Sequence, residues 1–286
     1  MSTLASPLAE NPTTAAALLH AHHPIEVAAQ VYGLRSMMVN LYFFGKNSEG
    51  AAWTLIDGGI PGSSSAIFKA AESLFGKDNP PQAIILTHGH YDHIGAVKPF
   101  LRKWLVPIYA HPLEMPFLTG QRDYSPPDPT VGQGLIARFS PLIPKRGHDY
   151  GAAVQALPSD GSVPGMPGWR WIHTPGHTPG HVSLFREKDH AVIAGDAFTT
   201  TRQESLWAVC RQRVEVRPPP AFYTTDWSAT RASMQRLADL KPLIAATGHG
   251  RVLSGPTLGS HLQNLIDQFG EQGVPKYGRY VRQTWR

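Results

Sequence analysis

The chain has 286 residues, of which 42% are hydrophobic and 16% are charged, so it can bury a full core in one elaborated domain. Its net charge of +5 comes from scattered Lys and Arg residues that form no basic stripe, which argues against a nucleic-acid partner. The single cysteine, Cys210, excludes an intrachain disulfide and a thiolate cluster for zinc. No segment approaches the ~20 apolar residues that cross a bilayer, so we expect a cytoplasmic protein without a membrane partner.

The first part of the chain alternates between strand and helix patterns. Apolar runs at 37–45 and 52–57, separated by a polar turn, predict a hairpin. An amphipathic helix closed by Gly76 follows. The next predicted elements are a buried strand, a partly helical segment and another strand, at 82–87, 96–105 and 106–111.

Later residues repeat the alternation after an irregular stretch. Short strands are predicted first, then a helix, a last core strand and a closing helix, at 169–174, 181–187, 190–196, 227–240, 242–250 and 257–273. Proline and glycine gather at 111–168, which predicts an insertion of the kind that builds substrate sites. We therefore expect one domain over 1–286, with this insertion and an N-terminal extension at about 1–36 that carries a solvated cluster of histidines.

One segment concentrates metal-binding side chains. In "AIILTHGHYDHIG", residues 83–95, a strand pattern leads into His88, His90, Asp92 and His93. A lone histidine is more often structural than a ligand, but four such groups within six residues reverse those odds. Imidazole and carboxylate suit zinc, iron or manganese rather than calcium or magnesium.

Three further candidates stand beside glycine at predicted strand ends. They are His177 in "TPGHTPGH", Asp196 in "IAGD" and His249 in "ATGHG". Glycine allows the backbone to turn tightly at these positions. Together with the 88–93 segment, they could complete a metal centre.

These motifs, in this order from about Val39 to His249, resemble the metallo-β-lactamase superfamily. The resemblance implies a four-layer αββα sandwich of the α/β (α+β) class, with two mixed sheets inside and helices outside. It also implies two divalent metal ions at one edge. Zinc is the expected metal, and iron and manganese are alternatives.

The resemblance further implies a role for each ligand. His88, His90 and His177 would hold one ion, Asp92, His93 and His249 the other, and Asp196 would bridge them. Two such ions share a water and lower its pKa towards neutrality, which supplies a hydroxide nucleophile. Asp92 would orient this nucleophile and pass a proton to the leaving group.

Several other residues are weaker candidates. Asp57 stands where family members carry an acidic residue, so it is interpreted as orienting a ligand histidine, with a turn or capping role as the alternative. His181 is a candidate for substrate contact or for starting a strand. Aromatic residues of the insertion, including Tyr124, Phe139 and Tyr150, are expected to roof the cleft. Aromatic residues after the bridging aspartate could line the pocket, although core packing is favoured for each: Phe198, Trp207, Phe222 and Tyr223.

The predicted function is hydrolysis of a carboxylic ester, lactone or thioester, because the aromatic insertion favours an organic small-molecule substrate over a long polyanion. Three alternatives stay open: β-lactam hydrolysis without a cysteine ligand, phosphodiester cleavage by an RNase Z-like nuclease, and a mononuclear iron dioxygenase acting on a persulfide through His88, His177 and Asp196. The basic aromatic tail at 274–286 leaves a homo-oligomer open.

Overall fold

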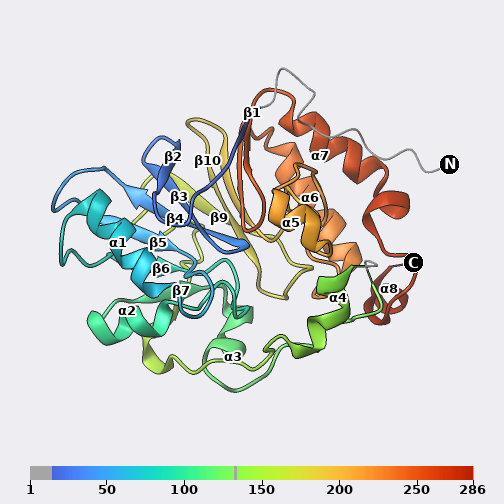
Figure 1. Ribbon diagram of the computed structural model, residues 1–286, viewed down its shortest axis with the longest axis horizontal. Coiled ribbons are helices and arrows are strands. Elements are labelled where there is room, and N and C mark those ends of the chain that lie inside the picture. The colour runs from blue at the N-terminus through green and yellow to red at the C-terminus, as the bar shows by residue number, and fades with distance from the viewer. Residues whose placement is uncertain (1–14, 132–133, 286) are drawn as a thin grey trace.

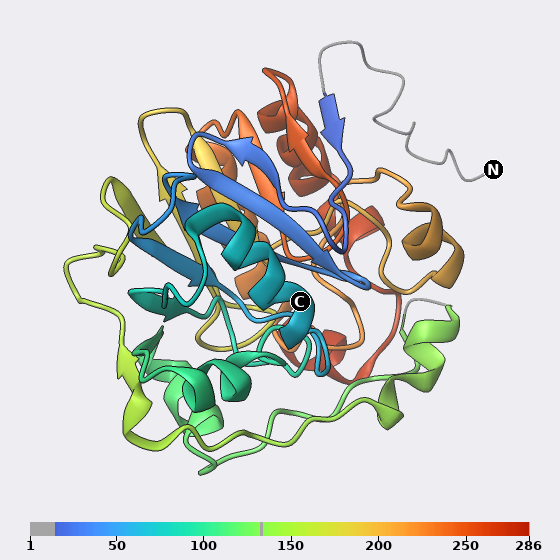
Figure 2. The same ribbon diagram turned by 60° about the vertical axis from the view of Figure 1, so that its left-hand side comes forward.

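The computed structural model describes residues 15–131 and 134–285. Two β-sheets pack face to face at the centre, and helices cover their outer faces (Figures 1 and 2). Both sheets contain parallel and antiparallel neighbours. This arrangement confirms the predicted αββα sandwich.

The first sheet has seven strands in the order β2-β3-β4-β5-β6-β7-β8. The strands are β2 (Ile25–Ala28), β3 (Val31–Ser36), β4 (Val39–Gly45), β5 (Trp53–Ile56), β6 (Ala83–Ile85), β7 (Ile108–Ala110) and β8 (Val154–Ala156). Strands β5 to β8 run parallel to one another. Because parallel strands end at the same edge of a sheet, the segments that follow β5 and β6 lie side by side.

The second sheet has six strands in the order β1-β13-β12-β11-β10-β9. The strands are β1 (Ala15–Ala17), β9 (Trp169–His173), β10 (Val182–Arg186), β11 (Ala191–Gly195), β12 (Ile244–Thr247) and β13 (Val252–Ser254). Strands β11 and β12 are parallel, which brings the residues after each to one edge.

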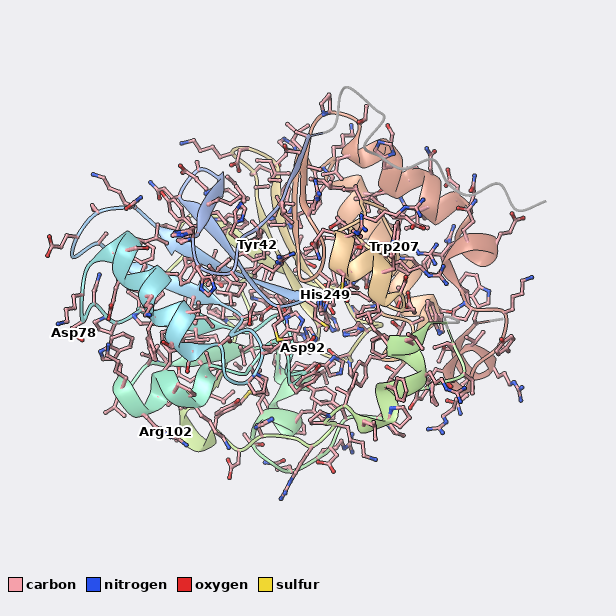
Figure 3. All side chains as sticks on the ribbon, viewed as in Figure 1. Tyr42, Asp78, Asp92, Arg102, Trp207 and His249 are labelled. Carbon is pink, nitrogen blue, oxygen red and sulfur yellow. The ribbon has the colours of Figure 1, made fainter. Side chains whose placement is uncertain are left out.

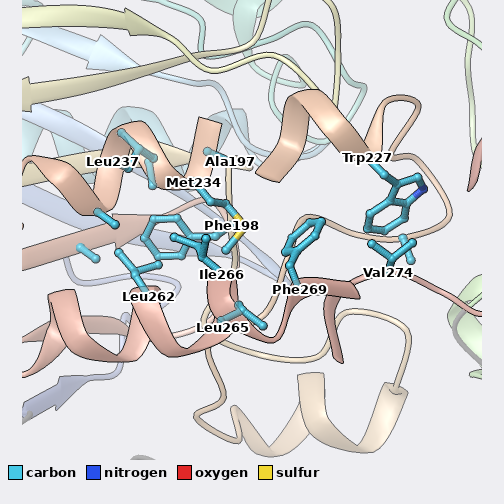
Figure 4. Packing of buried hydrophobic residues seen from close by; sticks show 14 of the residues in the cluster. Ala197, Phe198, Trp227, Met234, Leu237, Leu262, Leu265, Ile266, Phe269 and Val274 are labelled. Atoms are coloured by element: carbon cyan, nitrogen blue, oxygen red, sulfur yellow. The ribbon is translucent and has the colours of Figure 1, made fainter. Parts of the chain in front are cut away.

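The hydrophobic core lies in three layers. The middle layer, between the sheets, contains Tyr42, Ile85 and Ile193. Helices α1 (Ser64–Phe75) and α2 (Val97–Lys103) cover the first sheet, and α6 (Trp227–Asp239) and α7 (Leu258–Asp267) cover the second (Figures 1 and 4). The remaining helices are short: η2 (Pro112–Glu114), α3 (Met115–Leu118), α4 (Leu135–Phe139), η3 (Ser140–Leu142), η4 (Gly151–Ala153), α5 (Leu206–Arg211), η5 (Phe269–Gly273) and α8 (Arg279–Thr284).

Two predicted segments, the N-terminal extension and the insertion, differ from the structure. Residues 15–36 are not an appendage, because β2 and β3 belong to the first sheet and β1 pairs with β13 in the second. Residues 1–14 lie outside the described residues. The segment 111–168 is largely irregular, as predicted, but it also contributes β8 as the edge strand of the first sheet. Among the described residues, no helix has the length and apolar character needed to cross a membrane.

Candidate active site

The predicted ligands meet at one edge of the sandwich, where four strands end. His88 to His93 follow β6, and His177 lies in the turn between β9 and β10. Asp196 and His249 follow the parallel strands β11 and β12. Figure 3 shows Asp92 and His249 close together between the two sheets. The tertiary structure therefore brings together side chains that are far apart in the sequence.

Three groups of donor atoms are close enough to hold metal ions. The atoms within each group lie within 4.8 Å of one another, and the groups are His88–His90–His177, His88–His93–Asp196 and Asp92–His93–His249. The first and third correspond to the two ligand sets that the family resemblance implied. His88 and His93 also belong to the group that contains Asp196, so the sets form one continuous cluster.

Asp196 lies between the two sets. Its Oδ2 atom is 3.5 Å from Nε2 of His177 and 3.2 Å from Nε2 of His249, and its Oδ1 atom is 3.6 Å from Nε2 of His93. A Cβ atom at Gly248 would collide with this carboxylate, so glycine is required before His249. The carboxylate thus faces histidines of both sets, as a bridging ligand must.

Several donor atoms in the cluster have no protein partner. Among the described residues, the buried atoms Nε2 of His88, Nε2 of His93 and Oδ1 of Asp196 accept or donate no hydrogen bond. Unpaired buried polar atoms are costly, and bound cations would satisfy them. Imidazole and carboxylate donors also match the chemistry of zinc, iron or manganese. The residues present therefore fit divalent metal ions.

The Nδ1 atoms of two candidate ligand histidines, His93 and His249, are held by the surrounding protein. Nδ1 of His93 lies 2.8 Å from Oδ2 of Asp57, and Nδ1 of His249 lies 2.8 Å from the Met38 carbonyl. Asp57 also accepts hydrogen bonds from the backbone N–H and the hydroxyl of Thr87, both at 2.8 Å. Such partners fix the ring orientation and the tautomer of a ligand histidine.

The electrostatics of the cluster reflect this mixture of imidazoles and carboxylates. Burial and the neighbouring imidazoles hold the pKa of His88 well below its usual range. Burial would also lower the pKa of His93, but Asp196 and Asp57 outweigh it and raise the pKa to about 10. For Asp196, burial opposes ionisation, but His249 and His93 keep its pKa far below the usual value. Asp196 is therefore an anion, as a metal ligand must be.

His181 lies beneath the cluster rather than in the cleft. It is fully buried, and its Nε2 accepts the backbone N–H of Asp196 at 2.8 Å. Its Nδ1 therefore carries the proton and donates to the hydroxyl of Thr174 at 2.9 Å. Burial and His177 lower the pKa of His181 to about 3, so the ring is neutral. This corrects the substrate-binding role considered for His181: it positions Asp196.

Glu114 is a site residue that the sequence did not reveal. Its carboxylate is fully buried and accepts hydrogen bonds from the backbone of Gly89 at 3.1 Å and of Gly180 at 2.9 Å. It also accepts from the hydroxyls of Thr178, at 2.7 Å, and Tyr124. Glu114 thus ties the 88–93 turn to the turn that carries His177. Its position within a proline-rich segment gave no local signal of this role.

The cleft over the cluster has an apolar roof. A cavity of about 30 Å³ is lined by apolar and aromatic side chains together with ligand residues: Met38, His90, Tyr91, Asp92, Ile136, Ile143, His177, Asp196, Gln203, Pro220, Phe222, Tyr223 and His249. The roof residues Ile136 and Ile143 come from the insertion. No lysine or arginine among the described residues lines this cavity. Apart from the candidate ligands, Tyr91 and Gln203, the lining is therefore apolar or aromatic.

The aromatic residues that were candidates for the cleft lie in different surroundings. The Tyr124 ring lies 4.6 Å from the ring of His90, so it does border the cluster. Tyr150 packs in the core of the first sheet, and Phe139 points largely into solvent, which corrects their expected place in the roof. Phe198 is fully buried among α6 and α7 (Figure 4), which confirms the favoured core-packing role and excludes the pocket role also considered for it. Trp207 is exposed.

Comparison with known proteins agrees with this geometry. The model of the metallo-β-lactamase superfamily matches residues 35–249. The chain is 45% identical over 243 residues to the probable metallo-hydrolase YflN of Bacillus subtilis (strain 168), and the match covers 85% of this chain and 92% of that protein. The chain belongs to the metallo-β-lactamase superfamily. It is a metallo-hydrolase, and its His/Asp cluster is the expected site for divalent metals.

Two further known proteins are similar to this metallo-hydrolase. The chain is 34% identical over 223 residues to the uncharacterized protein YobT of Bacillus subtilis (strain 168), and the match covers 77% of this chain and 86% of that protein. A metallo-β-lactamase family protein from Thermus thermophilus has a similar structure, with a TM-score of 0.57 and 20% identity over 86% of this chain and 81% of the other. At that identity the structural likeness supports the fold alone.

Proposed function

We propose that this metallo-hydrolase cleaves a carboxylic ester, lactone or thioester of a small organic molecule, using two divalent metal ions. Zinc is the first choice of metal, with iron or manganese as alternatives. His88, His90 and His177 would hold one ion, and Asp92, His93 and His249 the other. Asp196 would bridge the two ions.

The position of Asp196 carries the proposal. Its two carboxylate oxygens face His93 on one side and His177 and His249 on the other, at 3.2 to 3.6 Å. A structural zinc site needs only four ligands, whereas this cluster has seven candidates, of which one is the shared carboxylate. A pair of bound ions in such a site lowers the pKa of water and polarises a carbonyl oxygen.

The protein side chains supply the remaining functions. Asp92 lines the cavity, and its Oδ2 atom lies 3.6 Å from Nε2 of His249. We assign the proton transfer to its carboxylate, which would accept a proton from the attacking water and return it to the leaving group. Asp57 keeps the imidazole of His93 in one orientation. The apolar side chains of Ile136, Ile143 and Phe222 would exclude bulk water and contact the acyl group.

The lining of the cavity supports an acyl substrate over a polyanion. Binding of a phosphodiester chain relies on lysine and arginine, and the cavity has none among its described lining residues. The reacting group of an ester, lactone or thioester is uncharged, whereas a phosphodiester carries a negative charge.

The test is a substrate panel on protein loaded separately with zinc, iron and manganese. Metal content per chain is measured by elemental analysis, and turnover is measured for lactones, thioesters, simple esters, a β-lactam, a phosphodiester and a persulfide with oxygen uptake. The proposal expects two ions per chain and turnover of acyl substrates. Turnover confined to the phosphodiester, the β-lactam or the persulfide would reject it in favour of the corresponding alternative.

A further inference from the structure

Tyr223 stands out because it lines the cleft and carries a buried hydroxyl that no described residue bonds. Tyr223 is 7% exposed, and among the described residues its hydroxyl has no hydrogen-bond partner. The hydroxyls of two other buried tyrosines are paired: Tyr42 donates to the Thr247 carbonyl at 2.7 Å, and Tyr280 to the Pro126 carbonyl at 2.6 Å. An unpaired buried hydroxyl destabilises a fold, so its retention calls for a partner that arrives from outside.

The Tyr223 ring lies directly against the metal cluster. Its centroid is 4.6 Å from that of His90, with an angle of 33° between the rings, and 6.5 Å from that of His177. The residue lines the cavity that also contains Asp92 and Asp196. It also lines a second small cavity, to which His90, His177 and Thr178 contribute. A substrate bound over the cluster would therefore lie within reach of the phenol.

The backbone holds this ring in place. The N–H groups of Tyr223 and Thr224 both donate to the Pro220 carbonyl at 3.1 Å, which closes a tight turn. The N–H groups of Thr225 and Asp226 both donate to the Gly176 carbonyl at 3.0 Å. The segment that carries Tyr223 is thus fixed to the turn that carries His177, so the backbone of Tyr223 is held relative to that candidate ligand.

We propose that the Tyr223 hydroxyl donates a hydrogen bond to the carbonyl oxygen of the substrate and stabilises the negative charge that forms there. This inference rests on the proposed acyl hydrolysis and names a further catalytic residue for it. As hydroxide adds to the carbonyl carbon, the C=O π pair moves onto oxygen, and the phenol hydrogen-bonds to that oxyanion while keeping its proton. When the pair returns, the C–O or C–S bond breaks, and the leaving group receives a proton from Asp92.

The test compares Tyr223→Phe with Tyr280→Phe in the metal-loaded enzyme. Each variant removes one buried phenol oxygen, but the Tyr280 hydroxyl bonds to a backbone carbonyl outside the cleft. We expect Tyr223→Phe to lower kcat by roughly 100- to 1,000-fold with little change in KM or metal content, as for the loss of one oxyanion donor. Its Tm should be equal to or higher than that of the wild type, because the variant lacks the unpaired hydroxyl. Tyr280→Phe should keep wild-type kcat.

A binding measurement separates hydrogen bonding from packing. Calorimetry would compare a phosphonate, which mimics the tetrahedral oxyanion, with an amide that mimics the uncharged substrate. Tyr223→Phe should weaken phosphonate binding by at least about tenfold and leave amide binding nearly unchanged, because only the former carries the charge that the phenol stabilises. Equal losses for both ligands would show that the hydroxyl does not favour the oxyanion over the uncharged carbonyl, and would overturn the inference.

The outcomes also distinguish this inference from the proposed function. Wild-type turnover of acyl substrates with an unchanged kcat in Tyr223→Phe would reject the role of Tyr223 alone. Absence of acyl turnover in the wild-type enzyme would reject the proposed function, and the inference would fall with it.

Discussion

Oδ2 of Asp57 lies 2.8 Å from Nδ1 of His93, although the two residues follow different strands. Strands β5 and β6 are parallel neighbours, so the residue after β5 reaches the turn after β6. Asp57 has a left-handed backbone conformation, with φ of 59°, and both of its carboxylate oxygens are hydrogen bonded. A strained residue that is held this firmly is typical of a functional site.

Asp57→Asn should lower metal affinity or kcat by roughly 10- to 100-fold, because the amide no longer fixes the His93 ring as an anionic acceptor does. Metal titration and steady-state kinetics would measure the effect. Asp160→Asn is a suitable control, since Asp160 bonds only within its own exposed turn. Equal metal affinity and kcat in Asp57→Asn and the wild type would contradict the assignment.

Glu114→Gln should destabilise the fold and loosen the site. The carboxylate accepts from four donors, and an amide would turn one of its oxygens into a donor that faces other donors. The expected loss is roughly 1–3 kcal/mol of unfolding free energy, measured by denaturant titration. Glu187→Gln, at a largely exposed position, should change little. If the denaturation midpoint of Glu114→Gln equals that of the wild type, the four hydrogen bonds of Glu114 contribute no stability.

His90→Ala and Asp196→Ala should each reduce turnover to background while keeping the fold. Each removes a proposed ligand from a buried cluster, so the site would bind metal incompletely. Circular dichroism checks the fold, and kinetics with matched metal loading checks the activity. Wild-type turnover in either variant would reject the proposed mechanism.

Removal of metal should abolish activity and lower thermal stability. A ligand that binds only the folded state stabilises it by about 2.7 kcal/mol at one hundred times its Kd. Dialysis against a chelator should therefore lower the Tm, and added zinc should restore both Tm and turnover. If the Tm does not depend on metal while the cluster is intact, the cluster does not bind it.

His111 should titrate well below an ordinary histidine. Burial, and then the His173 ring stacked 4.1 Å away, lower the pKa of His111 to about 4 from 6.5. Its Nδ1 accepts the Leu113 N–H at the start of the turn that carries Glu114. Since the folded pKa lies below the unfolded one, the neutral ring contributes stability that is fully present above pH 6.5 and is lost as pH falls through about 4.

NMR titration of the His111 ring protons checks this, and His173→Gln should raise the midpoint by removing the neighbouring imidazole. A wild-type midpoint near 6.5 would contradict the prediction.

The identity and spacing of the ligand residues are local properties, so the sequence alone could predict them. Residues 88–93 place four donors in one turn, and glycine beside Asp196 and His249 marks tight approaches. Apolar runs likewise predict the strands that end at these residues. The family resemblance supplied the pairing of the ligands into sets.

Only the tertiary structure decided the surroundings of Glu114, His181 and Tyr223. Glu114 lies 25 residues from Gly89 and 66 from Gly180, so its hydrogen bonds to them form only once both turns are in place. Phe198 and Tyr223 are both aromatic residues of the same region, yet one packs against α6 and α7 and the other faces the cleft. Periodicity describes which residues are apolar along one segment. Which surface then meets a side chain depends on how distant segments pack.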